Sequence, residues 1–396
     1  MVRTHGRQAP LLLGLAFSAL TLALHLAPVW VTMLNRGAQD WLGHPLPHDY
    51  LAHCVAEHRG GADPAFARRP LTTWSIDALA LLGVPVNGAF IAVGLTGFLL
   101  TGLLIHRIAL RLGASPAEAL LSQALFHASP TVLFAWFNPL YTYDEPLQYL
   151  ALSLGILWLL RQRWAAAALA LTAALIARET SALLLPALLL LAPQRQRAAL
   201  LAAPLLLYAV FLLLHGDPGL DAWPGDLLRR ADCLALNLGP ARLGETVAYL
   251  VLVLALPTYL LVRLRGQAPE PHRRLVTGFL VALALNTAVV LSAALAREAR
   301  LFALPLLLGW PLLGAALRAE LRQAGGWRGL TALMRNYRTA AVLAALLLLV
   351  SFAVFSLFEP STGIEEDSLF HEWLIAELGL IAALVLARRR MRTTAA

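Results

Sequence analysis

Long apolar segments alternate with short polar ones along almost the whole chain. A helix needs about 20 apolar residues to cross a bilayer, and no soluble core requires so many runs near this length. The pattern predicts an all-α polytopic transmembrane helical bundle of about 10–12 spans, forming a single integral membrane domain over residues 1–396. The apolar runs are 11–34, 86–105, 117–137, 146–160, 164–177, 181–192, 199–214, 246–262, 275–296, 301–317, 339–357 and 373–387.

The composition agrees with a bilayer as the main solvent, because 59% of the residues are hydrophobic and only 14% are charged. All 31 basic residues are arginine and none is lysine, which excludes mechanisms that use a lysine nucleophile or Schiff base. This usage is also typical of a GC-rich bacterial genome. We therefore expect a multi-pass protein of the bacterial inner (cytoplasmic) membrane.

The distribution of charge predicts which segments face which side. If the chain starts in the cytoplasm and crosses at each run, 21 arginines fall on the cytoplasmic side and 19 acidic residues on the outer side. This asymmetry obeys the positive-inside rule and predicts cytoplasmic N- and C-termini. It also explains the net charge of +8 without a nucleic-acid partner. The long outer loops are 35–70, 215–245 and 358–372, with an amphipathic interfacial helix at 71–83.

Charged residues interrupt the apolar segment 164–192 at Arg178 and Glu179. A single span here would place both charges at mid-membrane and would leave arginines at both ends. We therefore expect a hairpin of two short helices, 164–177 and 181–192, whose tip lies below the outer surface in a cavity lined by protein. Charges buried at such depth are commonly functional, although pairing of Arg178 and Glu179 with neighbouring helices for stability is an alternative.

The first outer loop carries many titratable groups. Asp49 or Asp40 could accept a proton from an acceptor hydroxyl as a general base, and a solvated polar loop is the alternative. The loop also offers metal ligands, so a divalent metal cofactor stays open, although the sequence requires none and prolines interrupt the ligand spacing. These ligands are His44, His48, Asp49, His53 and His58.

Asp144 and Glu145 lie at the outer mouth of the run 146–160. Paired carboxylates can share acid–base or binding work. Because Pro146 suits the first position of a helix, the same acids could instead serve only as helix caps.

Several arginines fall on the outer side, where the positive-inside rule disfavours them. Arg297 and Arg300 could grip a phosphate in the two-point geometry that arginine provides, or could form a salt-bridged turn at the interface. Arg69 is a further outer arginine, and binding of an anionic substrate would explain it.

Cys54 and Cys233 are the only cysteines, and both fall in outer segments. A disulfide between them and two free thiols are both open. No Walker loop, Gly-rich dinucleotide motif, zincin helix or nucleophile elbow occurs, so nothing supports chemistry with cytosolic nucleotides.

The layout resembles the GT-C class of multi-spanning membrane glycosyltransferases, which use polyprenyl-phosphate-linked sugars. The resemblance lies in the acid-bearing first loop, the helix near 71–83, the short hairpin with Arg178 and Glu179, and Arg297 to Arg300 before a late span. It implies an inverting sugar transfer on the outer face, with Asp49 or Asp40 as base and outer arginines holding the lipid phosphate. The implied partners are membrane lipid and a lipid-linked sugar donor.

Two other classes of function stay open. In a transporter or lipid flippase, Arg178, Glu179 and Glu377 would line a translocation path through broken helices. The absence of an internal repeat and the bias of acids to the outer side favour the enzyme. A non-catalytic membrane protein would need none of the outer acids.

Overall fold

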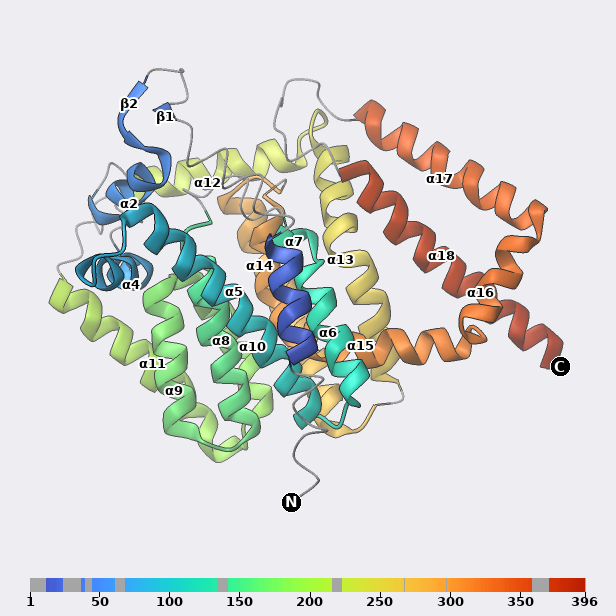
Figure 1. Ribbon diagram of the computed structural model, residues 1–396, viewed down its shortest axis with the longest axis horizontal. Coiled ribbons are helices and arrows are strands. Elements are labelled where there is room, and N and C mark those ends of the chain that lie inside the picture. The colour runs from blue at the N-terminus through green and yellow to red at the C-terminus, as the bar shows by residue number, and fades with distance from the viewer. Residues whose placement is uncertain are drawn as a thin grey trace.

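The computed structural model describes residues 12–23, 37–39, 45–60, 68–133, 142–215, 223–266, 268–296, 298–357 and 370–395. These residues form a helical bundle with one short two-stranded ribbon (Figure 1). Five helices are long and apolar enough to cross a membrane, or six if one bent pair counts as a single span. The predicted class, a helical membrane bundle, is confirmed.

The first half of the chain places the ribbon and the helices that surround the hairpin. The ribbon pairs β1 with β2 in antiparallel order, with Gly37 opposite Asp49. A helix at Leu12–Ala23 precedes it. The elements that follow this helix are β1 (Gly37–Gln39), β2 (Pro45–Asp49), α2 (Tyr50–Gly60), α4 (Pro70–Leu81), α5 (Val86–Arg111), α6 (Pro116–His127), α7 (Pro130–Leu133), α8 (Glu145–Leu160) and α9 (Trp164–Ala177).

The second half adds the return arm of the hairpin and the remaining long helices. Its elements are the 3-10 helix η2 (Glu179–Leu184), α10 (Leu185–Leu188), the 3-10 helix η3 (Leu189–Leu191), α11 (Gln194–His215), α12 (Trp223–Leu238), α13 (Leu243–Arg265), α14 (Glu270–Ala293), the 3-10 helix η5 (Ala299–Phe302), α15 (Ala303–Gln323), α16 (Gly326–Arg335), α17 (Tyr337–Leu357) and α18 (Phe370–Ala395).

Helix α15 forms the centre of the bundle. In its most apolar 18-residue stretch 89% of the residues are buried, whereas the figure for the peripheral helix α11 is 11%. It packs on α6, α13 and α14. Trp310 of α15 meets Phe126 of α6 in an edge-to-face contact with the ring centroids 4.8 Å apart. The exposed apolar side chains of α11, such as Leu213 and Leu214, are what a lipid-facing helix presents.

The predicted hairpin is present. Its first arm is α9 with 14 residues, and its second arm runs over Glu179–Leu191 as one short helix of mixed 3-10 and α geometry. Trp164 at the start of the first arm and Leu191 at the end of the second line the same cavity. The chain therefore returns to its starting level, and the charged break lies at the far end.

Two of the segments predicted as outer loops contain regular secondary structure. The segment 35–70 contains the ribbon and α2, and the segment 215–245 contains the amphipathic α12. The predicted helix at 71–83 is confirmed as α4, whose first and last residues lie within two residues of the expected bounds.

Cys54 and Cys233 are both free, so the disulfide alternative is wrong. The segment 358–372 lies almost wholly outside the described residues.

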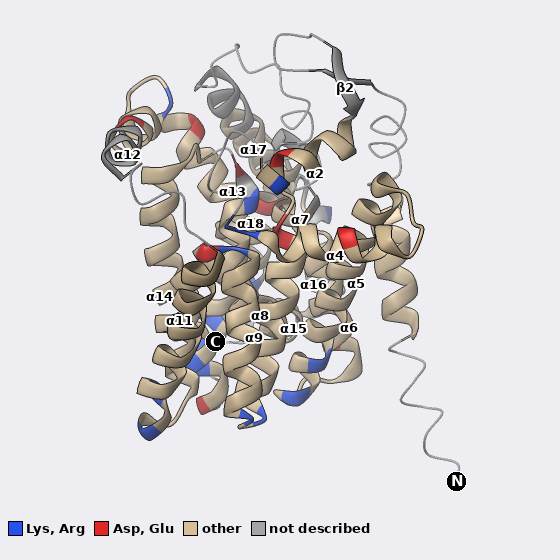
Figure 2. Ribbon diagram, turned by 90° about the vertical axis from the view of Figure 1, so that its left-hand side faces the viewer, with Lys and Arg blue, Asp and Glu red and all other residues tan. Residues whose placement is uncertain are grey.

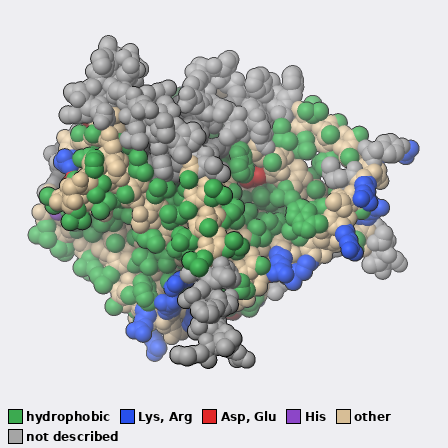
Figure 3. Space-filling view, in the orientation of Figure 1, with side chains coloured by type: hydrophobic (Ala, Val, Ile, Leu, Met, Phe, Trp, Pro, Cys, Tyr) green, Lys and Arg blue, Asp and Glu red, His purple; other side chains and the backbone are tan. Residues whose placement is uncertain are grey.

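Charge is divided unevenly between the two ends of the bundle. Figure 2 shows most arginines at the lower ends of the long helices, whereas acidic residues gather toward the end that carries β2 and α2. Apolar side chains cover the belt between these ends, with arginines along its lower edge (Figure 3). Such a belt matches a bundle surrounded by lipid.

Candidate functional site

Charged side chains meet at the break in the helical hairpin. Helix α9 ends at Ala177, and Arg178 takes an extended backbone conformation with φ −163° and ψ 124°. Gln148 of α8 donates from Nε2 to Thr180 Oγ1 at 3.1 Å and to Ser181 Oγ at 2.9 Å. Because both acceptors follow the break directly, these bonds tie the tip of the hairpin to α8.

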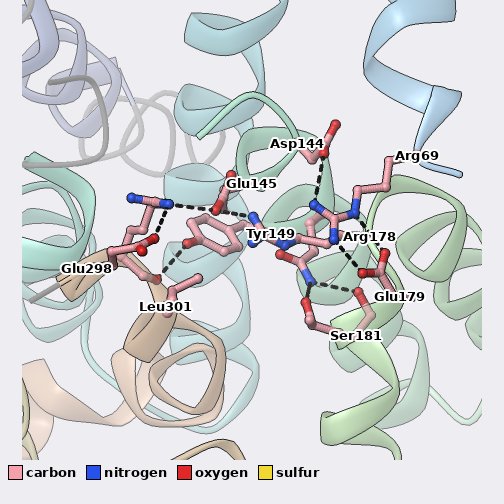
Figure 4. A network of polar contacts seen from close by, with 12 residues as sticks. Arg69, Asp144, Glu145, Tyr149, Arg178, Glu179, Ser181, Glu298 and Leu301 are labelled. Carbon is pink, nitrogen blue, oxygen red and sulfur yellow. Dashed lines mark hydrogen bonds and ion pairs between the residues drawn. The ribbon is translucent and has the colours of Figure 1, made fainter. Parts of the chain in front are cut away.

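Glu145 lies between two guanidiniums at this tip. Its Oε1 pairs with Arg178 Nη1 and lies 3.4 Å from Arg300 Nε, and Arg300 also pairs with Glu298 (Figure 4). Glu145 is 2% exposed, and Arg178 and Arg300 are each 8% exposed. One buried carboxylate therefore serves two buried arginines, and ion pairs removed from water in this way are only weakly screened.

Arg69 extends the network toward α2. Its Nε donates to Glu179 Oε2 at 2.8 Å, its Nη2 pairs with Glu179 Oε1, and its Nη1 lies 3.9 Å from Asp144 Oδ2. His58 Nδ1 of α2 lies 3.9 Å from the same Asp144 oxygen, and its ring stacks on Tyr143. Helix α2 thus contacts the charged cluster directly.

Asp144 precedes α8 and is only 1% exposed. Within the described part of the chain its Oδ1 has no hydrogen-bond partner. Burial raises the pKa of this carboxyl well above its ordinary value, although Arg69 acts in the opposite direction. A carboxyl of this kind keeps its proton at a higher pH than an exposed aspartate, which suits proton transfer.

The interpretation of the acids before Pro146 as helix caps is wrong for Asp144. Asp144 occupies the N-cap position, but its side chain makes no capping hydrogen bond, and Pro146 lies in the first turn as expected. Glu145 is turned into the protein and bonds Arg178 instead.

Arg300 is held in place through its backbone. Tyr149 Oη of α8 donates to Arg300 O at 3.3 Å, and Asn286 Nδ2 of α14 donates to Leu301 O at 2.9 Å. Both carbonyls belong to η5, so two neighbouring helices fix the turn that presents the guanidinium. Preorganisation of this kind is what stabilisation of a developing charge requires.

A cavity of about 40 Å³ opens beside Arg178 and Arg300. This volume holds roughly two or three water molecules, so a phosphate needs an outward movement of the lining. The cavity combines charged and polar groups on one side with apolar side chains on the other. It is lined by Glu145, Gln148, Tyr149, Arg178, Thr180, Leu183, Asn286, Val289, Val290, Arg300, Leu301 and Leu304.

Six of the nine residues predicted from the sequence meet in this one network. They are Arg69, Asp144, Glu145, Arg178, Glu179 and Arg300. Asp40 and Arg297 lie outside the described residues, and Asp49 ends β2 with its side chain outside them as well.

Four residues of the site were not predicted: His58 as an Asp144 partner, Gln148, Tyr149 and Asn286. Gln148 follows Glu145 by three residues and so shares its helix face, a signal present in the sequence. Asn286 is a lone amide within an apolar run, which also marks a polar contact inside a bundle. Tyr149 carries no such signal, because an aromatic residue in an apolar helix is ordinary.

Within the described part of the chain, no group of three or more His, Cys, Asp or Glu residues is arranged to hold a metal ion. The side chains of His44, His48 and Asp49 lie outside that part. The arrangement as described offers arginines for an anion and a buried carboxyl for a proton. Comparison with known protein families, curated proteins and solved structures found no match to this chain.

Proposed function

We propose that the protein is a membrane glycosyltransferase that moves a sugar from a polyprenyl-phosphate donor to an acceptor on the outer face of a bacterial cytoplasmic membrane. The observation that carries the proposal is the pair Arg178 and Arg300, buried around Glu145 at a cavity inside a bundle of apolar helices. Guanidiniums suit phosphate oxygens, and a bundle embedded in lipid gives a polyprenyl chain direct access.

The two arginines would stabilise the leaving group. Negative charge develops on the lipid phosphate as its bond to the sugar breaks, and preorganised cations in a water-poor site lower the energy of that state. Glu298 is 33% exposed and can move outward, whereas Glu145 is buried. The phosphate then replaces Glu298 at Arg300, while Glu145 keeps Arg178 in position.

A carboxylate of the first outer segment, Asp49 or Asp40, would take the proton of the acceptor hydroxyl. Asp49 directly precedes α2, and His58 of α2 contacts Asp144 in the network. The nine residues from Asp49 to His58 span about 13 Å of helix. Helix α2 would therefore join the proposed base to the network.

We also propose the number of membrane spans and the orientation of the bundle in the membrane. The shorter apolar helices Leu12–Ala23, Glu145–Leu160, Trp164–Ala177 and Glu179–Leu191 would raise the count from five or six spans to nine or ten. Helices α6 and α18, which overlap the predicted runs 117–137 and 373–387, would complete about 10–12 spans with both termini in the cytoplasm. The arginine-rich end of the bundle would then face the cytoplasm and the network the outer side.

The test is incorporation of radiolabelled sugar from a polyprenyl-phosphate donor pool by membranes that contain the wild type, Asp49→Asn, Asp40→Asn, Asp144→Asn, Arg178→Ala or Arg300→Gln. Arg318→Gln is the matched control, because the Arg318 side chain is 47% exposed, pairs with Glu118 and lies outside the cavity lining. Loss of Arg300 should lower the rate about 10²-fold at equal expression, because one charge-stabilising group is removed.

Loss of transfer in Asp49→Asn or in Asp40→Asn identifies the base, and Arg318→Gln should keep the wild-type rate. Transfer at the wild-type rate in Arg178→Ala and Arg300→Gln would contradict the proposed role of the arginines. No transfer from any donor would instead favour the transporter or flippase, for which the broken hairpin with Arg178 and Glu179 also fits. Silence of Asp40→Asn, Asp49→Asn and Arg178→Ala alike would favour a non-catalytic membrane protein.

A further inference from the structure

A second arginine cluster lies at the opposite end of the bundle from the network. Four arginines from three long helices surround a cavity of about 380 Å³, which we call the arginine pocket. Figure 2 shows this end of the bundle as the one where arginines gather. The arginine pocket is lined by Leu190 of η3, Arg197 of α11, Arg265 of α13, and Glu270, Arg273, Arg274 and Thr277 of α14.

The pocket carries an excess of positive charge. Glu270 is its single acid and pairs with Arg273 at 3.1 Å and with Arg274 at 2.9 Å. Arg197 is steadied by a bond from its Nε to Ala192 O at 3.2 Å. Neither Arg197 nor Arg265 forms an ion pair with a residue that the structure describes. Four guanidiniums around one carboxylate leave room for an anion with several oxygens.

An apolar cavity of about 310 Å³ adjoins the arginine pocket and shares Glu270 and Arg274 with it. Its other lining residues come from the ends of α8, α9 and η3, from the turns beside them and from the start of α14. A tryptophan beside such a cavity is typical of the level at which lipid headgroups meet acyl chains. These residues are Leu159, Leu160, Gln162, Trp164, Leu191, Pro193 and Pro271.

We infer that the arginine pocket binds the phosphate of an anionic phospholipid, with part of the glycerol and acyl region of that lipid lying in the adjoining apolar cavity. The site is separate from the proposed sugar-transfer site, since it shares no lining residue with the cavity beside Arg178 and Arg300. Basic pockets between membrane helices are suited to anionic headgroups, and the contribution of each arginine adds to the affinity.

The two neighbouring cavities distinguish a lipid from free phosphate. Inorganic phosphate satisfies the arginines alone, whereas a phospholipid also buries apolar surface beside Trp164 and Leu191. A zwitterionic lipid fills the apolar cavity but brings a cationic group toward the arginines. An anionic phospholipid is the ligand that matches both cavities.

The test uses the full chain, purified in neutral detergent and freed of lipid, and measures phosphatidylglycerol binding by native mass spectrometry. Parallel titrations use phosphatidylcholine. Inorganic phosphate and phosphatidylglycerol are each also tested for the ability to raise the unfolding temperature. The variant is Arg265→Gln with Arg273→Gln. The control is Arg318→Gln with Arg322→Gln, which removes two exposed arginines that contact Glu118 at the same end of the bundle.

The wild type should bind phosphatidylglycerol about tenfold more tightly than phosphatidylcholine. The double variant should lose about thirtyfold in affinity for phosphatidylglycerol, and the control should match the wild type. Equal binding by the double variant and the control would overturn the inference. A rise in unfolding temperature with inorganic phosphate as large as that with phosphatidylglycerol would assign the pocket to a soluble anion instead of a lipid. A double variant that unfolds is replaced by Arg265→Gln alone, measured against Arg318→Gln.

Discussion

Glu145 is the residue on which the charge balance of the network depends, since it separates the guanidiniums of Arg178 and Arg300. Replacing it by glutamine keeps the shape but leaves two buried cations without their shared counter-ion. We expect Glu145→Gln to lower the free energy of unfolding by about 3 kcal/mol, as loss of one partner of a buried ion pair does. Thermal or denaturant unfolding of the purified protein in detergent measures this change.

A matched control for this change exists at the surface. Glu270 also contacts two arginines, Arg273 and Arg274, but its side chain is 55% exposed. Glu270→Gln, measured without added lipid, should leave the unfolding midpoint almost unchanged because water screens the exposed charges. Equal destabilisation by both substitutions would show that Glu145 acts as an ordinary surface carboxylate.

At the same scale, the sequence indicates which residues are unusual but not which ones meet. Arg178 and Glu179 stand out because charges inside an apolar segment are costly. Their partners are distant in the chain: Arg69 lies 110 residues before Glu179, and Glu145 lies 33 residues before Arg178. Only the packing of helices decides such pairs. A single sequence holds no signal for them.

At the scale of elements, run lengths and flanking arginines were sufficient to predict the hairpin. Two short arms with a charged break follow from the cost of charge in the bilayer and from the arginines at both ends. The helix α12 was expected to be part of a loop, because its charged and polar residues interrupt the continuous apolar run that marks a span. Amphipathic helices outside the apolar runs are therefore the elements that a search for apolar runs misses.

Close approach of α6 and α15 depends on Gly314. A Cβ at this position would lie 2.0 Å from Glu118 O, and the backbone N–H of Gly314 donates to Ser122 Oγ at 3.0 Å. Gly314→Ala must push the central helix away from α6 and break this bond. We expect a loss of about 3 kcal/mol in stability, measured by unfolding in detergent.

Gly88 is the control for that substitution. It also lies in an apolar helix, α5, but a Cβ there would lie no closer than 3.5 Å to Val84 Cγ1. Gly88→Ala should leave stability unchanged or raise it slightly, since alanine favours helix more than glycine does. If Gly314→Ala were equally harmless, α6 and α15 could not be packed as closely as the structure has them.

At the scale of the whole molecule, the two free cysteines report on orientation, since the proposed topology puts α2 and α12 on the outer side. Cys54 is fully buried in α2, and burial raises its pKa to about 12, so almost none of it is reactive thiolate near pH 7. Cys233 in α12 is partly exposed.

A membrane-impermeant maleimide should label one thiol per chain in right-side-out vesicles and a second only after denaturation in SDS without reductant. Cys233→Ser should abolish the first label, and inverted vesicles should show none before SDS. Labelling of Cys233 in inverted vesicles would reverse the orientation and place the network around Glu145 on the cytoplasmic side, where a donor with its sugar outside the cell could not be used.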